Sequence, residues 1–499
     1  MSTPELDPNT PVIVGVGQIK QQLTDNYETA REQVELMEDA VRAAAADCSA
    51  EGDAGAVLSS IDRIGVVGGL WGYKDPGRQV ADVVGSPQAE SLLTYFGGNM
   101  PQALVAAYCR AVQAGECDLA VALGGETVYS RKKIKAAGGT PPCTQPDDMA
   151  DAARFGSDLA MSTEHERSLG LDRPPVVYAM FESAIRAEAG REVDEHLGTI
   201  SELWEGFNRV AVENPIAWTR TPMSSAQIRT AAPSNRMVNW PYTKAMNANP
   251  NVDQAAAVIV CSVAKAAELG IPQSQWVFPH SATEAHATML FSERENYHGN
   301  PAIRIAGNKA LELADATIAD VAHFDLYSCF PSVVQITVAE LEIPDDRTLT
   351  STGGLGFHGG PLNNYVMHGI ASLVEKLRAN PGDLGMVHAN GGYATKHAFG
   401  VYSTTPPTNP FAHADVQEQV DATPRREVDT APDGTGTIEA YVLPWEGDAP
   451  ARAILTAIME DGRRAIGVTD APDVLQSMLT DDYVGRPVTL KPDGTASIQ

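Results

Sequence analysis

The chain has 499 residues, which is too long for one hydrophobic core and predicts two or three domains. Its formal net charge at pH 7 is −28, which argues against partners such as nucleic acids and anionic membranes, because both require a basic face. No apolar run is long enough to cross a bilayer, and the opening MSTPELDPNTP lacks the segments of a signal peptide, so we expect a cytoplasmic protein.

The cysteines predict free thiols rather than disulfides or a metal centre. Six of them are scattered along the chain, and neither they nor the histidines show the spacing of a metal site. We therefore expect no metal and no covalently bound cofactor.

The chain begins with an apolar β-branched run, Pro11–Gln18, which predicts a buried strand. This run carries a G-x-G pattern, but Lys20 stands where the third glycine of a dinucleotide fingerprint belongs, so a Rossmann site is rejected. A helix should follow, with Asp25 as its N-cap. Its apolar face is predicted from the spacing of Val34, Met37, Val41 and Ala44.

The stretch TYFGGNMPQALVAAY, Thr94–Tyr108, predicts a strand end, a glycine turn and the start of a buried helix. Such a turn often places a nucleophile at a helix N-terminus, where free N–H groups stabilise negative charge. Here the turn contains neither Cys nor Ser. Buried strands are predicted on both sides, at Ile61–Gly69 and Cys117–Glu126.

Residues 127–245 interrupt this strand–helix alternation with helical segments and proline-rich turns, which indicates a large insertion. A strand and a helix then return in Asn251–Gly270. Beyond them the order of glycine loop, buried helix and strand recurs, with Gly115 and Gly382, and likewise Gly124 and Gly391, 267 positions apart. The chain therefore looks internally duplicated, with mostly parallel sheets covered by helices.

After residue 410 the composition changes to short alternating segments with one helix, which predicts a small, mainly β domain. We expect a first half at 8–126 and 246–272, an insertion at 127–245, a second half at 273–405 and an appended domain at 411–499.

The duplicated halves, the insertion and the segments MPQALVAAYCRAVQAGECDLAVALGGE, FDLYSCF, GGLGFHGGP and HANGG resemble the thiolase superfamily. The tail resembles the extra C-terminal domain of a thiolase-like subgroup. This resemblance implies a five-layer αβαβα core. It also implies an acyltransferase related to acetyl-CoA acetyltransferases, coenzyme A or acyl-CoA as the ligand, and a role in lipid metabolism.

In thiolases an acylated cysteine, an activating histidine and a second cysteine share one pocket, and this sequence departs from all three. The resemblance places Gly97 at the nucleophile, Gly360 at the histidine and Ala389 at the second cysteine. The turn keeps the family's frame without its reactive atom, so ordinary thiolase turnover should be absent or very weak.

Several nearby residues remain candidates for chemistry or for the pocket frame. Tyr327 can act as an acid, His358 as a base, Cys329 as a displaced nucleophile and Asn390 as an oxyanion ligand. Each also has an ordinary structural explanation. Residues expected to form the pocket frame are Asn99, Gly391 and Gly392.

The segment RKKIK is unusual in so acidic a chain. By resemblance, its Arg131, Lys132 and Lys133 are candidates for binding the phosphates of coenzyme A, although such a cluster is also typical of a solvated helix face.

Three functions remain open. The leading one is an acyl-CoA-handling protein without thiolase turnover. The second is a cysteine-independent aldolase, or carbon–carbon lyase, with Tyr327 as acid and His358 as base. The third is a non-catalytic CoA-binding protein or scaffold. By resemblance a homodimer is expected near Leu92–Phe96, and a monomer is also compatible with the tail covering that surface.

Overall fold

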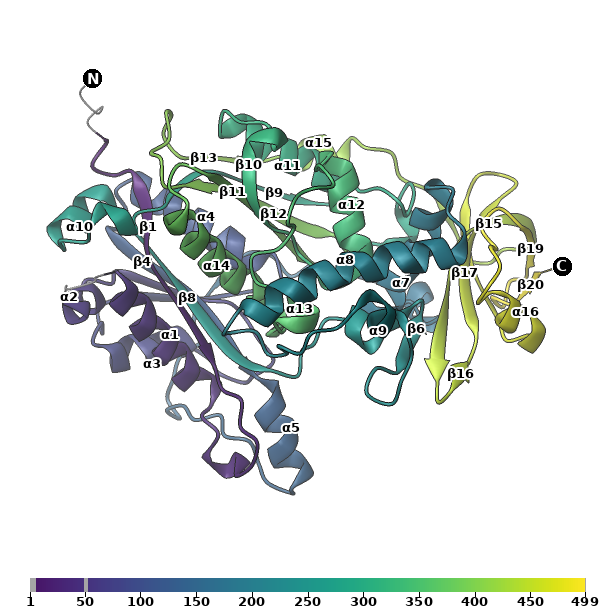
Figure 1. The fold of residues 1–499 in the computed structure, drawn as a ribbon, viewed down its shortest axis with the longest axis horizontal. Helices are drawn as coiled ribbons and strands as arrows, with labels where there is room; N and C mark the ends of the chain where they lie inside the picture. The colour runs from purple at the N-terminus through teal and green to yellow at the C-terminus, as the bar shows by residue number, and fades with distance from the viewer. Residues whose placement is uncertain (1–5, 49–52, 499) are drawn as a thin grey trace.

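The structure is a computed structural model and describes residues 6–48 and 53–498. Two β-sheets enclose a pair of buried helices, α4 (Met100–Gln113) and α14 (Tyr365–Ala379), and further helices cover the outer faces of both sheets (Figure 1). This arrangement is the predicted five-layer αβαβα core.

The first sheet has the strand order β1–β8–β4–β2–β3–β5. Its strands are β1 (Pro11–Lys20), β8 (Asp253–Ser262), β4 (Leu119–Thr127), β2 (Arg63–Val66), β3 (Glu90–Thr94) and β5 (Ala153–Phe155). On its outer face lie α1 (Gln33–Asp47), α2 (Ala54–Ser59) and α3 (Pro76–Val84), and α10 (Val263–Glu268) follows β8.

The second sheet has the order β10–β11–β12–β9–β13. Its strands are β10 (Val321–Asp325), β11 (Leu384–Gly391), β12 (Lys396–Ser403), β9 (Phe278–His286) and β13 (Ala412–Asp415). The helices on its outer side are α11 (Pro301–Leu313) and α12 (Pro331–Leu341), and the short α13 (Gly354–Phe357) precedes the buried α14.

The two sheets confirm the internal duplication. The order β1–β8–β4–β2 in the first corresponds to β9–β12–β11–β10 in the second. The equivalent glycines Gly124 and Gly391 lie on β4 and β11, and the equivalent helices α4 and α14 pack against each other between the sheets.

The predicted cap of the first helix is wrong. The helix α1 begins at Gln33, and Glu32 is its N-cap. Glu32 and Glu35 form a reciprocal capping box, which satisfies two backbone N–H groups at once. Asp25 lies in the preceding loop, too far along the chain to cap this helix.

The stretch 127–245 contributes to three parts of the molecule. It contains α5 (Val128–Ala136), α6 (Glu164–Ser168), α7 (Pro174–Glu188), α8 (Val193–Glu213), α9 (Ser225–Arg229), β6 (Met237–Trp240) and β7 (Tyr242–Thr243), besides β5. β5 pairs with the outer edge of β3, the strand at which a dimer was expected, and β6 pairs with a strand of the appended domain.

The appended domain is mainly β, as predicted. After α15 (Gln417–Asp421) its strands run in the order β14–β18–β17–β15–β19–β20, and it lies at one end of the molecule (Figure 1). The elements are β14 (Val428–Asp429), β15 (Gly434–Glu446), β16 (Ala449–Pro450), β17 (Ala453–Met459), β18 (Arg464–Thr469), α16 (Pro472–Ser477), β19 (Pro487–Leu490) and β20 (Ala496–Ile498). Short 3-10 helices elsewhere occupy Tyr27–Thr29, Lys244–Met246, Gln273–Gln275, Phe291–Glu293, Ile318–Asp320 and Leu362–Asn364.

Helix α7 joins the core to the appended domain. Its C-terminal half packs against β15, and Ser183 Oγ accepts a hydrogen bond of 2.8 Å from the backbone N–H of Tyr441. The buried Arg186 forms an ion pair of 2.5 Å with Asp482. The two parts are therefore tied by polar contacts at a buried helix face.

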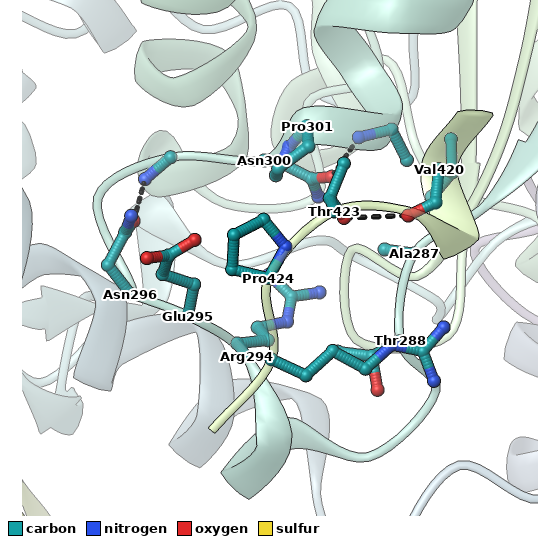
Figure 2. Close-up of a pocket in the computed structure, with 13 residues that line it drawn as sticks. Ala287, Thr288, Arg294, Glu295, Asn296, Asn300, Pro301, Val420, Thr423 and Pro424 are labelled. Atoms are coloured by element: carbon teal, nitrogen blue, oxygen red, sulfur yellow. Dashed lines mark hydrogen bonds between the residues drawn. The ribbon is translucent and has the colours of Figure 1, made fainter. Parts of the chain in front are cut away.

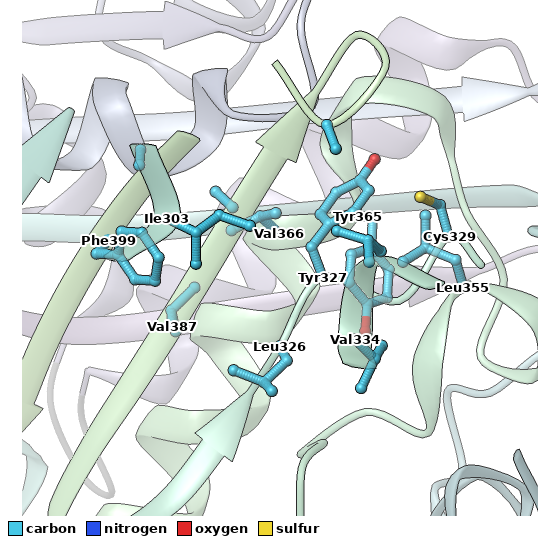
Figure 3. Close-up of a cluster of buried hydrophobic side chains, with 14 of the residues drawn as sticks. Ile303, Leu326, Tyr327, Cys329, Val334, Leu355, Tyr365, Val366, Val387 and Phe399 are labelled. Atoms are coloured by element: carbon cyan, nitrogen blue, oxygen red, sulfur yellow. The ribbon is translucent and has the colours of Figure 1, made fainter. Parts of the chain in front are cut away.

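One large apolar cluster extends through the middle layer and the second sheet. Figure 3 shows part of it, where Tyr327, Cys329, Leu355 and Tyr365 come together. Within the described residues, no helix combines the length and apolar character needed to cross a bilayer.

Candidate functional site

A cavity of about 450 Å³ lies where the N-terminal turn of α4 meets the segments that follow β10 and β11. Its walls are Phe96, Gly97, Gly98, Met161, Asp172, Pro174, Pro175, Tyr178, Ala248, Pro250, Tyr327, Cys329, Phe330, Leu355, Gly360, Leu362, Asn363, Asn390, Gly391, Gly392 and Tyr393. A second hollow of about 550 Å³, beside β3 and β5, contains none of the predicted site residues.

At Gly97 and Gly98 the turn before α4 presents backbone to the cavity and no side chain. A Cβ on Gly98 would lie 2.4 Å from the carbonyl oxygen of Asn390 and 2.6 Å from the hydroxyl of Tyr327. Only glycine allows the two halves of the core to approach so closely here. The equivalent of the thiolase nucleophile, Gly97, also lines the cavity.

Tyr327 follows β10 and lines the cavity, with its hydroxyl next to Gly98 of this turn. Its side chain is 7 % exposed, and burial is the main cause that raises the pKa of its hydroxyl. Among the described residues, none forms a hydrogen bond with that hydroxyl. It is therefore a neutral donor available to a ligand.

Cys329 is the one cysteine of the described chain that lines this cavity. Burial raises the pKa of its thiol to about 12, and the neighbouring side chains of Tyr178 and Asn390 only partly oppose this shift. Because the thiolate is the nucleophilic form, roughly 1 in 10⁵ molecules is reactive at pH 7. The arrangement does not activate this thiol.

Asn390 is held in place by a tyrosine that sequence reasoning missed. Its side-chain N–H donates to the hydroxyl of Tyr178 over 2.8 Å, and the backbone N–H of Ala394 donates to the same oxygen over 2.8 Å. The Tyr178 hydroxyl in turn donates to the carbonyl of Gly392 over 3.1 Å. Asn390 Oδ1 is buried and has no partner among the described residues.

Tyr178 lies on α7, in the insertion. The insertion was expected to contact ligand phosphates rather than to form the cavity wall. The sequence signal that was available is the pair Pro174–Pro175 at the start of an apolar helical stretch, which fixes a helix N-terminus. Nothing local connects that helix to Asn390, 212 positions later.

His358 does not line the cavity. It is fully buried, and Tyr365 contacts both His358 and Tyr327, with ring centroids 6.0 Å and 5.7 Å away. Burial lowers the pKa of His358 to about 4, so the ring is neutral near pH 7. The structure does not bring Tyr327 and His358 together as an acid–base pair.

Of the remaining predicted pocket positions, some line the cavity and others do not. Gly360, Gly391 and Gly392 line the cavity, whereas Ala389 and Asn99 do not. Ala389 is fully buried, on the face of β11 opposite to Asn390, as the alternation of a strand requires. Asn99 is the N-cap residue of α4 without a side-chain capping bond.

The basic side chains of α5 lie outside the cavity wall but are bonded to segments next to it. Lys132 donates to the side chain of Asn251, the neighbour of the cavity residue Pro250. Arg131 donates to the carbonyl of Leu70. In the same loop, the carbonyl of Gly68 accepts a hydrogen bond of 2.6 Å from the cavity residue Asn363. The third cation, Lys133, lies over the ring of Tyr129.

Within residues 6–48 and 53–498, no group of His, Cys, Asp and Glu side chains has the geometry to hold a metal ion.

Comparison with known proteins identifies the family. Residues 415–495 match the model of the thiolase-like protein type 1 additional C-terminal domain. The monomeric SCP2-thiolase-like protein type 1 of Mycobacterium smegmatis is 32% identical over 99% of this chain and 100% of that chain, with a TM-score of 0.84. The chain belongs to the type 1 SCP2-thiolase-like proteins. No curated protein matches this type 1 sequence.

More distant structures share the thiolase fold of this type 1 chain. The dimeric peroxisomal thiolase of Saccharomyces cerevisiae is 15% identical, with a TM-score of 0.58 over 80% of this chain and 98% of that one. An Ltp2–ChsH2(DUF35) aldolase is 18% identical, with a TM-score of 0.59 over 79% of this chain and 98% of that one. The expected thiolase-superfamily fold with an extra C-terminal domain is confirmed.

Proposed function

We propose that this thiolase-like protein binds the acyl end of an acyl-CoA in the cavity and does not use the cysteine-dependent route of thiolases. The cavity volume of about 450 Å³ is in the range of small-molecule sites. Its walls are mostly apolar, with a few polar groups on one side, which suits an acyl chain that ends in a thioester.

The observation that carries this proposal is the state of the thiol. Acyl transfer through an enzyme thioester needs a thiolate in the cavity. Gly97 supplies none, and burial of Cys329 favours the neutral thiol. Among the residues that the structure describes, no cation or histidine lines the cavity to reverse that preference.

Two groups support binding of the thioester carbonyl. The hydroxyl of Tyr327 is a free donor at the cavity wall, and the turn at Gly97 and Gly98 stands at the N-terminus of the 14-residue helix α4. Both favour partial negative charge on an oxygen between them. In this proposal they orient and polarise the carbonyl without forming a covalent bond.

The cations of α5 support a location for the CoA phosphates. Lys132 is tied to Asn251, the neighbour of the cavity residue Pro250. Arg131 is tied to Leu70, two residues after Gly68, whose carbonyl accepts a hydrogen bond from the cavity residue Asn363. A flexible pantetheine arm leaving the cavity on that side would bring its phosphates to these side chains, which are suited to bind them.

Calorimetric binding and a thiolysis assay test the proposal together. We expect acetyl-CoA or a longer acyl-CoA to bind, and acetoacetyl-CoA to be stable in the presence of the protein and free CoA. Cys329→Ala should leave both results unchanged. Robust thiolysis that disappears in Cys329→Ala would refute the proposed role of the cavity.

A matched pair of variants tests the CoA site. Arg131→Gln with Lys132→Gln should weaken binding of acyl-CoA but not of an acyl-pantetheine, which lacks the nucleotide phosphates. Lys135→Gln removes an equal kind of charge from an exposed position of the same helix and should have little effect. Because Lys135→Gln removes one charge and the double variant removes two, a loss in Lys135→Gln of about half that in the double variant would indicate a general charge effect.

Cysteine-independent carbon–carbon cleavage is the second candidate. Two observations favour it: the free hydroxyl of Tyr327 in the cavity, and the fold shared with an aldolase. Tyr327 would hold the carbonyl oxygen or the hydroxyl of a 3-hydroxyacyl-CoA, while His358 is not in position to act as its base. Cleavage of a 3-hydroxyacyl-CoA that is lost in Tyr327→Phe would establish this function. A chain that binds no CoA ester at all would instead favour the scaffold.

A further inference from the structure

A second, much smaller cavity lies between the start of α11 and the linker that leads from α15 into the appended domain (Figure 2). Its volume of about 30 Å³ holds one or two particles of the size of water. Its polar walls include Arg294, Asn300, Thr288, Thr423 and Arg425. It is separate from the acyl cavity, with which it shares no lining residue.

The most buried charge at this cavity is Arg294, whose side chain points to the space beneath Pro424 (Figure 2). The residue is only 5% exposed. One terminal nitrogen donates to the carbonyl of Tyr393 over 2.6 Å and also to that of Ala394. Its Nε is buried and has no partner among the described residues.

No carboxylate of the described residues forms an ion pair with Arg294. Glu295 also lines the cavity, but Figure 2 shows its carboxylate on the other side of Pro424. The nearby Glu340 is already engaged by Arg304 at 2.8 Å and by the backbone N–H of Asn300. Besides the two carbonyls that accept its hydrogen bonds, the ring of Phe181, with its centroid 4.9 Å from the guanidinium carbon, compensates part of the charge.

This cation is nonetheless charged at neutral pH. Burial lowers the pKa of Arg294 to about 10, still well above 7. A buried charge without a counter-charge is costly, and proteins almost always pair such groups. The neighbouring Arg464, whose guanidinium donates to the backbone carbonyl of Arg294, also lowers this pKa by charge repulsion. Its own charge is paired with Glu439 at 2.6 Å.

The second feature of the cavity is the N-terminus of the 13-residue helix α11. Pro301 and Ala302, its first residues, line the cavity, so the positive end of the helix dipole lies beside the same space as Arg294. Pro301 has no N–H, and the N–H of Ala302 donates to Oδ1 of Asn300 over 3.1 Å, so the helix contributes its dipole and no free donor. The side-chain N–H of Asn300 donates to the carbonyl of Ala394, the same acceptor that Arg294 uses. The cavity therefore combines a buried cation and a helix dipole of the same sign.

We propose that this cavity is a binding site for one compact monovalent anion of the size of chloride, held by the Arg294 guanidinium. The small volume excludes larger anions such as phosphate esters. The anion would supply the missing counter-charge. It would also connect the linker residues Thr423 and Pro424 to the second half of the core.

The first test uses the unmodified full-length protein. The chloride NMR line width should broaden on adding the protein, in a saturable way, and narrow when bromide competes. The melting temperature should rise with sodium chloride relative to sodium gluconate at equal ionic strength, following the binding isotherm. Absence of both effects would overturn the proposal. Saturable stabilisation by formate but not by chloride would overturn the assignment to a halide-sized ion.

Variants then locate the site. Arg294→Gln should weaken the apparent chloride affinity by roughly tenfold or more, because a charge-assisted hydrogen bond is lost, and Arg294→Lys should retain part of it. Arg42→Gln, an exposed position on α1, is the matched control and should titrate as the wild type does. If Arg294→Gln fails to fold, Arg294→Lys and the wild-type titration still decide. If the Arg294 variants bind chloride with the same affinity as the wild type, the assignment of the anion to Arg294 is overturned.

Discussion

The hydroxyl of Tyr178 is a single oxygen on which one wall of the 450 Å³ cavity depends. It accepts hydrogen bonds from the side chain of Asn390 and the backbone of Ala394, and it donates to the carbonyl of Gly392. Tyr178→Phe removes this oxygen without changing the shape of the ring, which stacks on Phe330 at 4.6 Å. The substitution therefore isolates the polar contribution.

The loss of unfolding free energy expected for Tyr178→Phe follows from the three groups that are bonded to the Tyr178 hydroxyl. No other protein partner is present for the Asn390 N–H groups, the Ala394 N–H or the Gly392 carbonyl among the described hydrogen bonds. A buried polar group left unpaired costs about 1–3 kcal/mol, so three of them predict a loss of about 3–5 kcal/mol when partial rearrangement is allowed. Tyr402→Phe is the matched control. It orphans only one acceptor, Gln102 Oε1, and should cost about 1–2 kcal/mol.

Urea unfolding followed by fluorescence and circular dichroism measures both variants, and calorimetry measures acyl-CoA binding. We expect Tyr178→Phe to be the less stable of the two and to bind the ligand more weakly, because Asn390 loses its fixed orientation. A destabilisation by Tyr178→Phe no larger than that by Tyr402→Phe would refute the reasoning that this hydroxyl organises the wall.

Three further outcomes are expected. Brief alkylation of the native protein at neutral pH should modify the exposed Cys143 and spare Cys329, whose raised pKa leaves almost no thiolate; mass spectrometry showing Cys329 modified first would contradict its buried state. Burial raises the pKa of Glu126 to about 7, so its folded form favours the proton, and stability should fall as pH rises from about 4.5 through 7. Glu126→Gln should abolish up to about 3 kcal/mol of that loss. If the variant and the wild type lose stability with pH in the same way, the raised pKa of Glu126 is rejected. Because β5 pairs with the edge of β3, light scattering should give a monomer near 53.0 kDa, and a stable dimer would show that another surface associates.

The layers of the core were predictable because their signals are local. Apolar runs and glycine loops repeat with a fixed offset, so the relation between Gly124 and Gly391 in the sequence is enough to indicate two similar halves. Gly97, Tyr327 and Asn390, which line the cavity, were singled out by another route, because they stand in or beside segments that resemble the active-site loops of thiolases.

The rest depended on contacts between distant parts of the chain. Tyr178 reaches Asn390 from the insertion, and no periodicity in either segment encodes that pairing. His358 stood in the right loop, but its burial behind Tyr365 follows from the packing of side chains and not from its position in the sequence. Asp25 failed as a helix cap because Glu32, closer to the helix, forms the capping box instead.

Helix α7 contacts both the appended domain and the cavity, and so connects the two. Pro174 and Tyr178, in the first turns of the helix, line the cavity. Ser183 and Arg186, roughly one and a half and two turns after Tyr178, contact the appended domain. A helix transmits tilt along its axis, so movement of the tail would be felt as a change in the cavity's width. If the cavity binds acyl-CoA as proposed, a chain shortened after the linker residue Pro424, which keeps β13 and α15, should differ from the full chain in acyl-CoA affinity.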